Sequence, residues 1–361
     1  MAVFYRALTV TLLTLSIAGC ASDRGVLGPG VTVAPPRAAG GSSPQDPTPS
    51  VTSDRQALQG ASIIRVRVTD ARGTRVISLP LEEYVLGAVR AELPPETLRD
   101  GASSRLLQVQ AIVSRTFAVA SVGRHAIDHF DLCDSTHCQI YRPALQTEGP
   151  NDPAALAVAN TRDQVITYQG HVIQALFHSS CGGHTTSAAA VWGGLDPPYL
   201  RPVVDTLCAR THPGDWTFAV AESDLRRALN ADPKTAVGDR LDRIDISSRD
   251  ESGRADLMTL AGARAPVVRS EELRAVISRA FGALAFRSTW FTVSRRGDRF
   301  VFAGVGYGHG VGLCQVGAIL LARAGQSPLD IITHYFPGTR ISSGTLAVAL
   351  PRDQSHIGEI P

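Results

Sequence analysis

A glutamate at the end of a helical pattern is the first residue of this chain that could do acid–base chemistry. In VRAELPPETL (89–98), an amphipathic run stops at Glu92, and two prolines follow Leu93. Proline disfavours helix in the residue before it, so the helix is expected to end beside this carboxylate. Partly buried over a cleft, a carboxyl group can donate and accept protons near neutral pH. Fully solvated, it has no such role, and this segment alone does not decide between the two.

A second candidate site is the segment CDSTHCQIY (133–141), in which two cysteines flank a histidine. Their thiolates and the imidazole between them are ligands that Zn²⁺ prefers. Either His125 or His129, just upstream, could supply the fourth ligand of a tetrahedral site. An exported protein also permits a disulfide between Cys133 and Cys138, which would close a small loop. The residues support both interpretations.

Two glycine-rich segments could line a groove for a large polar ligand. FHSSCGGHT (177–185) offers imidazoles and hydroxyls beside a Gly-Gly turn, and GVGYGHGVGLCQVGA (304–318) surrounds His309 with glycines. Glycine lets a ligand approach the backbone closely. The second segment matches neither a dinucleotide fingerprint nor a phosphate-binding loop with its lysine, so it does not indicate nucleotide binding. The serine–histidine pair in the first lacks the Gly-x-Ser-x-Gly turn of hydrolases.

The elements that must position these residues are hairpins and helices without regular βαβ alternation, which predicts an α+β fold. Apolar spacing predicts helices over 81–93 and 103–121, with Ser103 or Ser104 capping the second. A short loop joins these helices, so we expect them to pack as neighbours with Glu92 at one end of the pair. Further hairpins are expected over 63–80, 164–180, 243–262 and 288–306, and further helices over 222–230, 270–282 and 315–325.

The amino terminus has the pattern of a lipoprotein signal peptide, residues 1–20. Arg6 precedes an apolar stretch that is too short to span a membrane and that ends in IAGC at Cys20. We expect Cys20 to be lipidated and to anchor an exported protein to a membrane. Ala21, rather than Asp, follows it. By resemblance to known lipoprotein sorting, this places the protein on the periplasmic side of the outer membrane, with the outer face of the cytoplasmic membrane as the alternative.

The rest of the chain divides into a tether, a folded domain and a tail. Residues 21–60 are rich in Pro, Gly and Ser and predict a flexible tether with a mean reach of about 35 Å. The folded domain is expected over 61–350, with an inserted smaller α/β lobe at 216–286, and 351–361 form the tail. The net charge is +2 without a basic run or an aromatic stacking motif, which argues against nucleic-acid binding.

Taken in order, several motifs resemble those of the stage II sporulation protein D (SpoIID/LytB) family of peptidoglycan-active proteins. The resemblance runs from about Leu79 to Leu346. It rests on SLPLEEYVLGAVRAELPPE (78–96), LQVQAIVSRTFAVA (107–120), CDSTHCQIY (133–141), HSSCGGHTTSAAAVWGG (178–194) and GHGVGLCQVGA (308–318).

The family resemblance implies a lytic transglycosylase. Such an enzyme cleaves the β-1,4 bond between N-acetylmuramic acid and N-acetylglucosamine and leaves a 1,6-anhydro sugar, and family members prefer glycan stripped of its stem peptides. The family's catalytic glutamate maps to Glu92, as a single general acid/base. Some relatives act mainly as enhancers of amidases, so a non-catalytic wall-binding lipoprotein with an amidase partner is the alternative. A zinc hydrolase is a third candidate.

The resemblance also bears on the remaining sites. Family members bind zinc near the segment that matches CDSTHCQIY, which favours a metal, Zn²⁺ in a structural role, over a disulfide. The expected zinc ligands are Cys133, His137, Cys138 and His129, with His125 as the alternative to His129. We expect glycan contacts from Gln139, Tyr141, His178, Ser179, His184, His309 and Gln315, in a groove between the site segments. Cys181 and Cys314 stand where many members carry Ser, and two of Cys181, Cys208 and Cys314 could form a disulfide.

Overall fold

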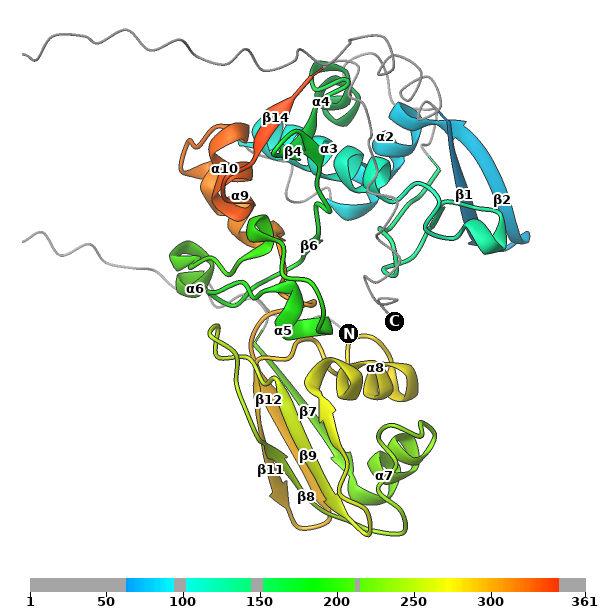
Figure 1. Cartoon of the computed structure of the whole chain (residues 1–361), viewed down its shortest axis with the longest axis vertical. Coiled ribbons are helices and arrows are strands. Elements are labelled where there is room, and N and C mark those ends of the chain that lie inside the picture. Colours follow the sequence, from blue (N-terminus) through cyan, green and yellow to red (C-terminus); the bar gives the residue numbers. More distant parts are fainter. Residues whose placement is uncertain (1–62, 94–101, 144–151, 212–214, 344–361) are drawn as a thin grey trace, which may run out of the picture. The chain divides into compact units, whose positions relative to one another are not determined.

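The computed structural model of the protein confirms the α+β fold (Figure 1). The structure describes residues 63–93, 102–143, 152–211 and 215–343. The expected signal peptide, Cys20, the tether and the tail lie outside these ranges, as do Pro94 and Pro95. Within the described ranges, no helix combines the length and apolar character needed to cross a membrane.

The first hydrophobic core joins residues from both ends of the described chain, from Ile64 to Phe336. β1 and β2 form an antiparallel hairpin, and β3 pairs with β1 in parallel. A second sheet has the order β14-β4-β5, and β6 pairs with β13 in parallel. The strands are β1 (Ile63–Asp70), β2 (Gly73–Pro80), β3 (Leu132–Cys133), β4 (Val165–Tyr168), β5 (His171–Val172), β6 (Phe177–His178), β13 (Leu313–Cys314) and β14 (Arg340–Ser342). The α-helices are α2 (Leu81–Glu92), α3 (Ser103–Ala120), α4 (Pro153–Asn160), α5 (Ala188–Trp192), α6 (Thr206–Thr211), α9 (Gln315–Arg323) and α10 (Pro328–Tyr335).

A second hydrophobic core is formed by residues from Trp216 to Phe302, which lie in the sequence between the segments that form the first core. Its two sheets have the orders β10-β9-β8 and β11-β12-β7. Its elements are β7 (Trp216–Ala221), α7 (Glu222–Asn230), β8 (Leu241–Ile246), β9 (Leu257–Gly262), β10 (Val267–Arg269), α8 (Ser270–Phe281), β11 (Phe291–Arg296) and β12 (Arg299–Gly304).

The inserted lobe is longer than the 216–286 expected from the sequence. The β11–β12 hairpin belongs to it, because β12 pairs with β7 along its whole length. Phe291 and Phe302 also pack against Phe286, with ring centroids 4.8 and 5.1 Å apart. The lobe therefore continues to the end of β12, where the glycine-rich segment begins.

Helix α3 is central to the first core, with buried residues on all of its sides. It begins at Ser103 with Ala102 in the capping position, so neither expected serine is the N-cap. The helix also buries a charge, since the side chain of Arg115 is only 1% exposed. Its guanidinium donates two hydrogen bonds to the carboxylate of Glu82 in α2, at 2.8 and 2.7 Å, and a third to the carbonyl oxygen of Val158 in α4, at 3.3 Å. This ion pair fixes α2 against α3 and α4.

Glu82→Gln should lower the free energy of unfolding by about 3 kcal/mol, because removing one partner of a buried ion pair leaves the other charge uncompensated. Urea denaturation measures the difference. Glu83→Gln, at an exposed position of the same helix, is the matched control and should change stability by less than about 0.5 kcal/mol. Equal effects of the two substitutions would show that Glu82 does not compensate the charge of Arg115.

Candidate functional site

Glu92 is the last residue of α2, and it is half-buried. The backbone N–H of Ile140 donates a hydrogen bond to its Oε1 at 2.7 Å, and Gln315 Nε2 lies 3.5 Å from its Oε2. The same Gln315 amide nitrogen lies 3.5 Å from Gln110 Oε1 of α3. Segments from three distant parts of the sequence thus meet at this carboxyl group.

Burial raises the pKa of Glu92 from 4.5 to about 7. The hydrogen bonds from Ile140 and Gln315 act in the opposite direction, because they stabilise the carboxylate. The net result is a carboxyl group that can gain or lose a proton near neutral pH. A group that first donates and then accepts a proton in a reaction requires this property. A fully solvated Glu92 is therefore not what the structure shows.

This raised pKa should be visible in the pH dependence of stability. The unfolded chain ionises Glu92 near pH 4.5 and the folded chain near pH 7, so the folded state loses relative stability as the pH rises through this window. We expect Glu92→Gln, which keeps the shape without the charge, to stabilise the fold above the window by up to about 3 kcal/mol. Below the window it should have little effect. Urea denaturation of both proteins on each side of the window measures this, and a difference that does not change with pH would contradict the raised pKa.

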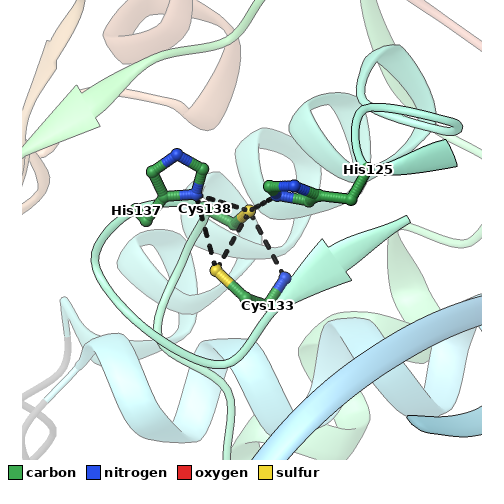
Figure 2. A group of neighbouring side chains, drawn as sticks. All are labelled: His125, Cys133, His137 and Cys138. Carbon is green, nitrogen blue, oxygen red and sulfur yellow. Dashed lines mark hydrogen bonds between the residues drawn. The ribbon is translucent and has the colours of Figure 1, made fainter. Parts of the chain in front are cut away.

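Two residues before Ile140, Cys138 belongs to a group of four potential metal ligands (Figure 2). His125, Cys133, His137 and Cys138 each contribute one ligand atom, and these atoms lie within 4.8 Å of one another. Cys133 ends the short strand β3, and both cysteines are free thiols. The hydrogen bond between the two thiol groups lowers the pKa of Cys133, which favours a thiolate at that position.

The distances within this group fit a tetrahedral zinc site. Bonds of about 2.3 Å to sulfur and about 2.0 Å to nitrogen place neighbouring ligands of a tetrahedron about 3.3–3.8 Å apart. The sulfur atoms of Cys133 and Cys138 are 3.4 Å apart, and His137 Nδ1 lies 3.6 and 3.7 Å from them. His125 Nε2 lies 3.3 Å from Cys138 Sγ. Two thiolates and two imidazoles are a donor set that zinc prefers, so these residues fit the ion that the resemblance implies.

His129 does not belong to this group, and His125 takes the place expected for it. His129 is exposed, with a left-handed backbone (φ 64°), directly after the short 3₁₀ helix η2 (Ala126–Asp128). His125 instead stacks on Phe130, with ring centroids 4.5 Å apart. The turn of the chain at η2 therefore brings His125, rather than His129, to β3.

Three of the expected glycan contacts lie near Glu92. Gln315 contacts its carboxyl group, whereas Gln139 and Tyr141, which flank Ile140, are buried. Gln139 Nε2 donates to the carbonyl oxygen of Ser114 at 3.2 Å. Tyr141 stacks on Tyr84 of α2, with ring centroids 5.2 Å apart. Both side chains therefore pack the segment that carries Ile140 against the core, which corrects their expected role as sugar contacts.

Two of the expected histidine contacts make hydrogen bonds to the backbone. His178 is buried, and its Nδ1 lies 3.1 Å from the carbonyl oxygen of Val311. His309 Nε2 donates to a carbonyl oxygen of β6 at 3.0 Å, and its Nδ1 accepts from the N–H of Val311 at 3.1 Å. Burial lowers the pKa of both rings, that of His309 to about 3. These neutral rings hold the glycine-rich segment against β6. Ser179, His184 and His309 are each partly exposed and remain candidates for sugar contact.

Sequence reasoning missed two features of the site. The N–H of Ile140 is a main-chain donor, which no residue type reveals. A second group of potential metal ligands also lies in the first core: Cys181, Asp205, Cys208 and Cys314. The odd number of cysteines was the only signal for it, and nothing in the sequence pointed to the aspartate.

Comparison with known proteins identifies the family. The family described as stage II sporulation protein, SpoIID, matches residues 69–168, which contain Glu92 and the His–Cys group. An uncharacterized protein of Brachyspira hyodysenteriae (strain ATCC 49526 / WA1) is 30% identical over 273 residues, which cover 74% of this chain and 67% of that protein. The chain belongs to the SpoIID family.

Other SpoIID relatives have names that refer to function. Stage II sporulation protein D of Bacillus subtilis (strain 168) is 29% identical over 296 residues, 78% of this chain and 80% of that protein. A protein of the same organism named amidase enhancer is 26% identical over 285 residues, 67% of this chain and 38% of that protein. A second family, a domain of unknown function (DUF8618), matches residues 214–312 and so covers the second hydrophobic core.

Proposed function

We propose that this SpoIID-family protein acts on the bacterial cell wall as a lytic transglycosylase, with Glu92 as its only general acid/base. The observation that carries the proposal is the pKa of Glu92, which burial raises to about 7. The substrate is the bond between N-acetylmuramic acid and N-acetylglucosamine, in glycan strands stripped of stem peptides. The product end is a 1,6-anhydro-muramic acid.

In the proposed reaction, protonated Glu92 gives its proton to the bridging oxygen as the glycosidic bond breaks. The carboxylate then accepts the proton of the C6 hydroxyl of the same sugar, whose oxygen attacks C1. Hydrolytic glycosidases need a second carboxylate to attack or to activate water. Here the nucleophile is part of the substrate, which supplies the proximity advantage and makes one carboxyl group sufficient.

The partners of Glu92 support the same cycle. Among the described residues, its hydrogen bonds come from a backbone N–H and a side-chain amide, both of them donors. These donors stabilise the carboxylate that forms after the first proton transfer. Ile140 and Gln315 are thus positioning residues, which also limit how far burial raises the pKa.

The zinc ion implied by the family resemblance would be held by His125, Cys133, His137 and Cys138. A bound zinc ion of this kind stabilises the surrounding loop. We propose a structural role, because this loop carries the N–H of Ile140 to Glu92. In this proposal, Glu92 alone carries out the proton transfers.

The site of action that we propose is the cell envelope. Lipidation of Cys20 would anchor the protein on the periplasmic side of the outer membrane, or on the outer face of the cytoplasmic membrane. Metabolic labelling with a palmitate analogue tests the anchor: label lost in Cys20→Ala supports it, and a label that persists contradicts it.

The decisive experiment compares products from intact and from peptide-stripped peptidoglycan by mass spectrometry. A lytic transglycosylase gives fragments with 1,6-anhydro-muramic ends, and more of them from the stripped glycan. Reducing muramic ends would indicate a hydrolytic glycosidase, and released stem peptides would indicate an amidase or peptidase. Either result would reject the proposed reaction.

The similarity to the protein named amidase enhancer favours one alternative, a wall-binding protein that stimulates an amidase. This alternative predicts binding to peptidoglycan without any anhydro product. It also predicts faster release of stem peptides when a purified amidase of the same organism is added. Glu92→Gln should then bind peptidoglycan and stimulate release of stem peptides as wild type does, which separates this function from the enzyme.

A further inference from the structure

A second group of buried ligands takes no part in the chemistry proposed for Glu92. Cys181 follows β6, Asp205 precedes α6, Cys208 lies in α6 and Cys314 ends β13. All four residues are buried, and their ligand atoms lie within 4.8 Å of one another. We propose that Cys181, Asp205, Cys208 and Cys314 bind a second zinc ion, which joins these segments of the first core.

The distances in this group are those of a tetrahedral site with three sulfur ligands and one oxygen ligand. Zinc–sulfur bonds of about 2.3 Å place two thiolates about 3.8 Å apart, and a carboxylate oxygen about 3.5 Å from a thiolate. The sulfur atoms of Cys208 and Cys314 are 3.8 Å apart, and Cys181 Sγ lies 3.4 Å from Asp205 Oδ2. Soft thiolate ligands select zinc over magnesium, calcium or manganese.

Backbone N–H groups donate hydrogen bonds to sulfur atoms of the group, as is expected for thiolates that bind a metal. The N–H groups of Cys181 and Gly317 donate to Cys314 Sγ at 3.2 and 3.3 Å. The N–H of Gly183 donates to Cys181 Sγ at 3.3 Å. Donors directed at sulfur stabilise the thiolate that binds metal. The hydroxyl of Tyr335 donates to Asp205 Oδ2 at 2.7 Å, and such contacts orient a ligating carboxylate.

A buried cation lies next to the group and favours negative charge there. Arg254, from the inserted lobe, is 1% exposed, and its guanidinium donates to the carbonyl oxygen of Cys181 at 2.6 Å. Its Nε and Nη1 are buried without a hydrogen-bond partner among the described residues. A buried charge is costly unless an opposite charge compensates it. Asp250 and Glu271 supply part of this compensation. Three thiolates and a carboxylate around one Zn²⁺ carry a net negative charge, which supplies more.

A disulfide explains the group less well. A disulfide would join two of the three sulfur atoms at about 2 Å and would leave the third thiol and Asp205 buried beside it. The structure instead has three free thiols whose sulfur atoms lie within 4.8 Å of one another. The zinc ion uses all four residues, and thiols that bind it lose their protons.

Zinc bound to this second group would also help to position a residue that contacts Glu92. Cys314 is followed directly by Gln315, the residue that begins α9 and contacts the carboxyl group of Glu92. A Cβ at Gly317 would collide with the hydroxyl of Tyr335 and the carboxylate of Asp205, so glycine is needed for α9 to approach the group. Zinc bound here would therefore fix the end of the helix that positions Gln315.

The test is the zinc content of the full chain, purified in detergent and measured by inductively coupled plasma mass spectrometry. We expect two zinc ions per chain, one for each group of four ligands. Cys208→Ser should lose one of them and Cys133→Ser the other. If the first group held no zinc, wild type would contain one ion, lost in Cys208→Ser and retained in Cys133→Ser, and the present proposal would still stand. Zinc content that is unchanged in Cys208→Ser would overturn it.

X-ray absorption at the zinc edge assigns the ligands of the remaining ion. In Cys133→Ser it should show three sulfur ligands and one oxygen, and in Cys208→Ser two sulfur and two nitrogen ligands. Asp205→Cys is a second variant that keeps a metal-binding group in place, and it should retain zinc in a site with four sulfur ligands. If Asp205→Cys lost one zinc ion while keeping the circular dichroism of wild type, the result would contradict the proposed second zinc site.

Thiol counting separates metal from disulfide. Wild type is denatured with chelator and an alkylating agent, without reductant, and Cys181, Cys208 and Cys314 are followed by peptide mass spectrometry. A zinc site leaves all three alkylated, whereas a disulfide leaves only one alkylated and refutes the proposal. Neither the zinc content nor the alkylation depends on whether the protein cleaves glycan, so this proposal and the proposed enzyme can fail separately.

Discussion

Glu92→Gln should reduce the rate of 1,6-anhydro-muramic acid formation from peptide-stripped glycan by about 10³-fold, the range typical for loss of a general acid/base. The substitution leaves an acceptor for the N–H of Ile140 at nearly the same position. It removes only the ability to transfer a proton. The rate is measured by mass spectrometry of released fragments under conditions where wild-type release is linear in time.

The pH profile of the wild type gives a second measure of the same group. Because Glu92 must start protonated, activity should fall as the pH rises through about 7, the pKa that burial gives it. Glu83→Gln, at an exposed position of the same helix, is the matched control and should keep both the rate and the profile. Activity that survives in Glu92→Gln, or a profile without a decline near this pH, would remove Glu92 from the role of general acid.

Cys138→Ser should have the largest effect on stability. It removes a ligand from the His125–Cys133–His137–Cys138 group, and a metal that binds only the folded state stabilises it in proportion to the logarithm of its concentration. With free zinc at about 1,000 times the dissociation constant, the free energy of unfolding should fall by about 4 kcal/mol. Urea denaturation at fixed free zinc measures this loss. Chelator added to wild type should cause a loss at least as large, because it removes zinc from both groups.

Activity should fall together with stability in Cys138→Ser, since Ile140 lies two residues after the substituted ligand. A displaced Ile140 no longer donates to Glu92, and loss of that hydrogen bond moves the pKa of Glu92 further upward. Residual activity should therefore decline at a higher pH than in wild type. His129→Ala changes an exposed histidine of the same segment that lies outside the group, and it should match wild type in stability, zinc content and profile. An equal loss in His129→Ala would contradict the ligand set.

The sequence predicted the main elements well, since their apolar periodicity is set by local packing. The helices expected over 81–93 and 103–121 are α2 and α3, and the one expected over 222–230 is α7. Capping was predicted less well: the serines expected to cap α3 lie at or just inside its start. Composition at a helix start shows where the chain turns, but not which residue takes the capping position.

Features that depend on contacts between distant segments could not be predicted. Burial of Gln139 and Tyr141 depends on α2 and α3, which pack over their segment. The choice of His125 over His129 depends on a turn that brings the chain back to β3. The extension of the inserted lobe to β12 depends on pairing with β7, which lies some 80 residues earlier in the chain.

The contact between Glu92 and Gln315 joins residues 223 positions apart. During synthesis, the segment with the acid emerges first, and its amide partner emerges only after most of the chain has been made. A nascent or truncated polypeptide would hold Glu92 without this partner and without the packing that α9 provides. The activity proposed for Glu92 would then arise late, once synthesis of the chain is almost complete.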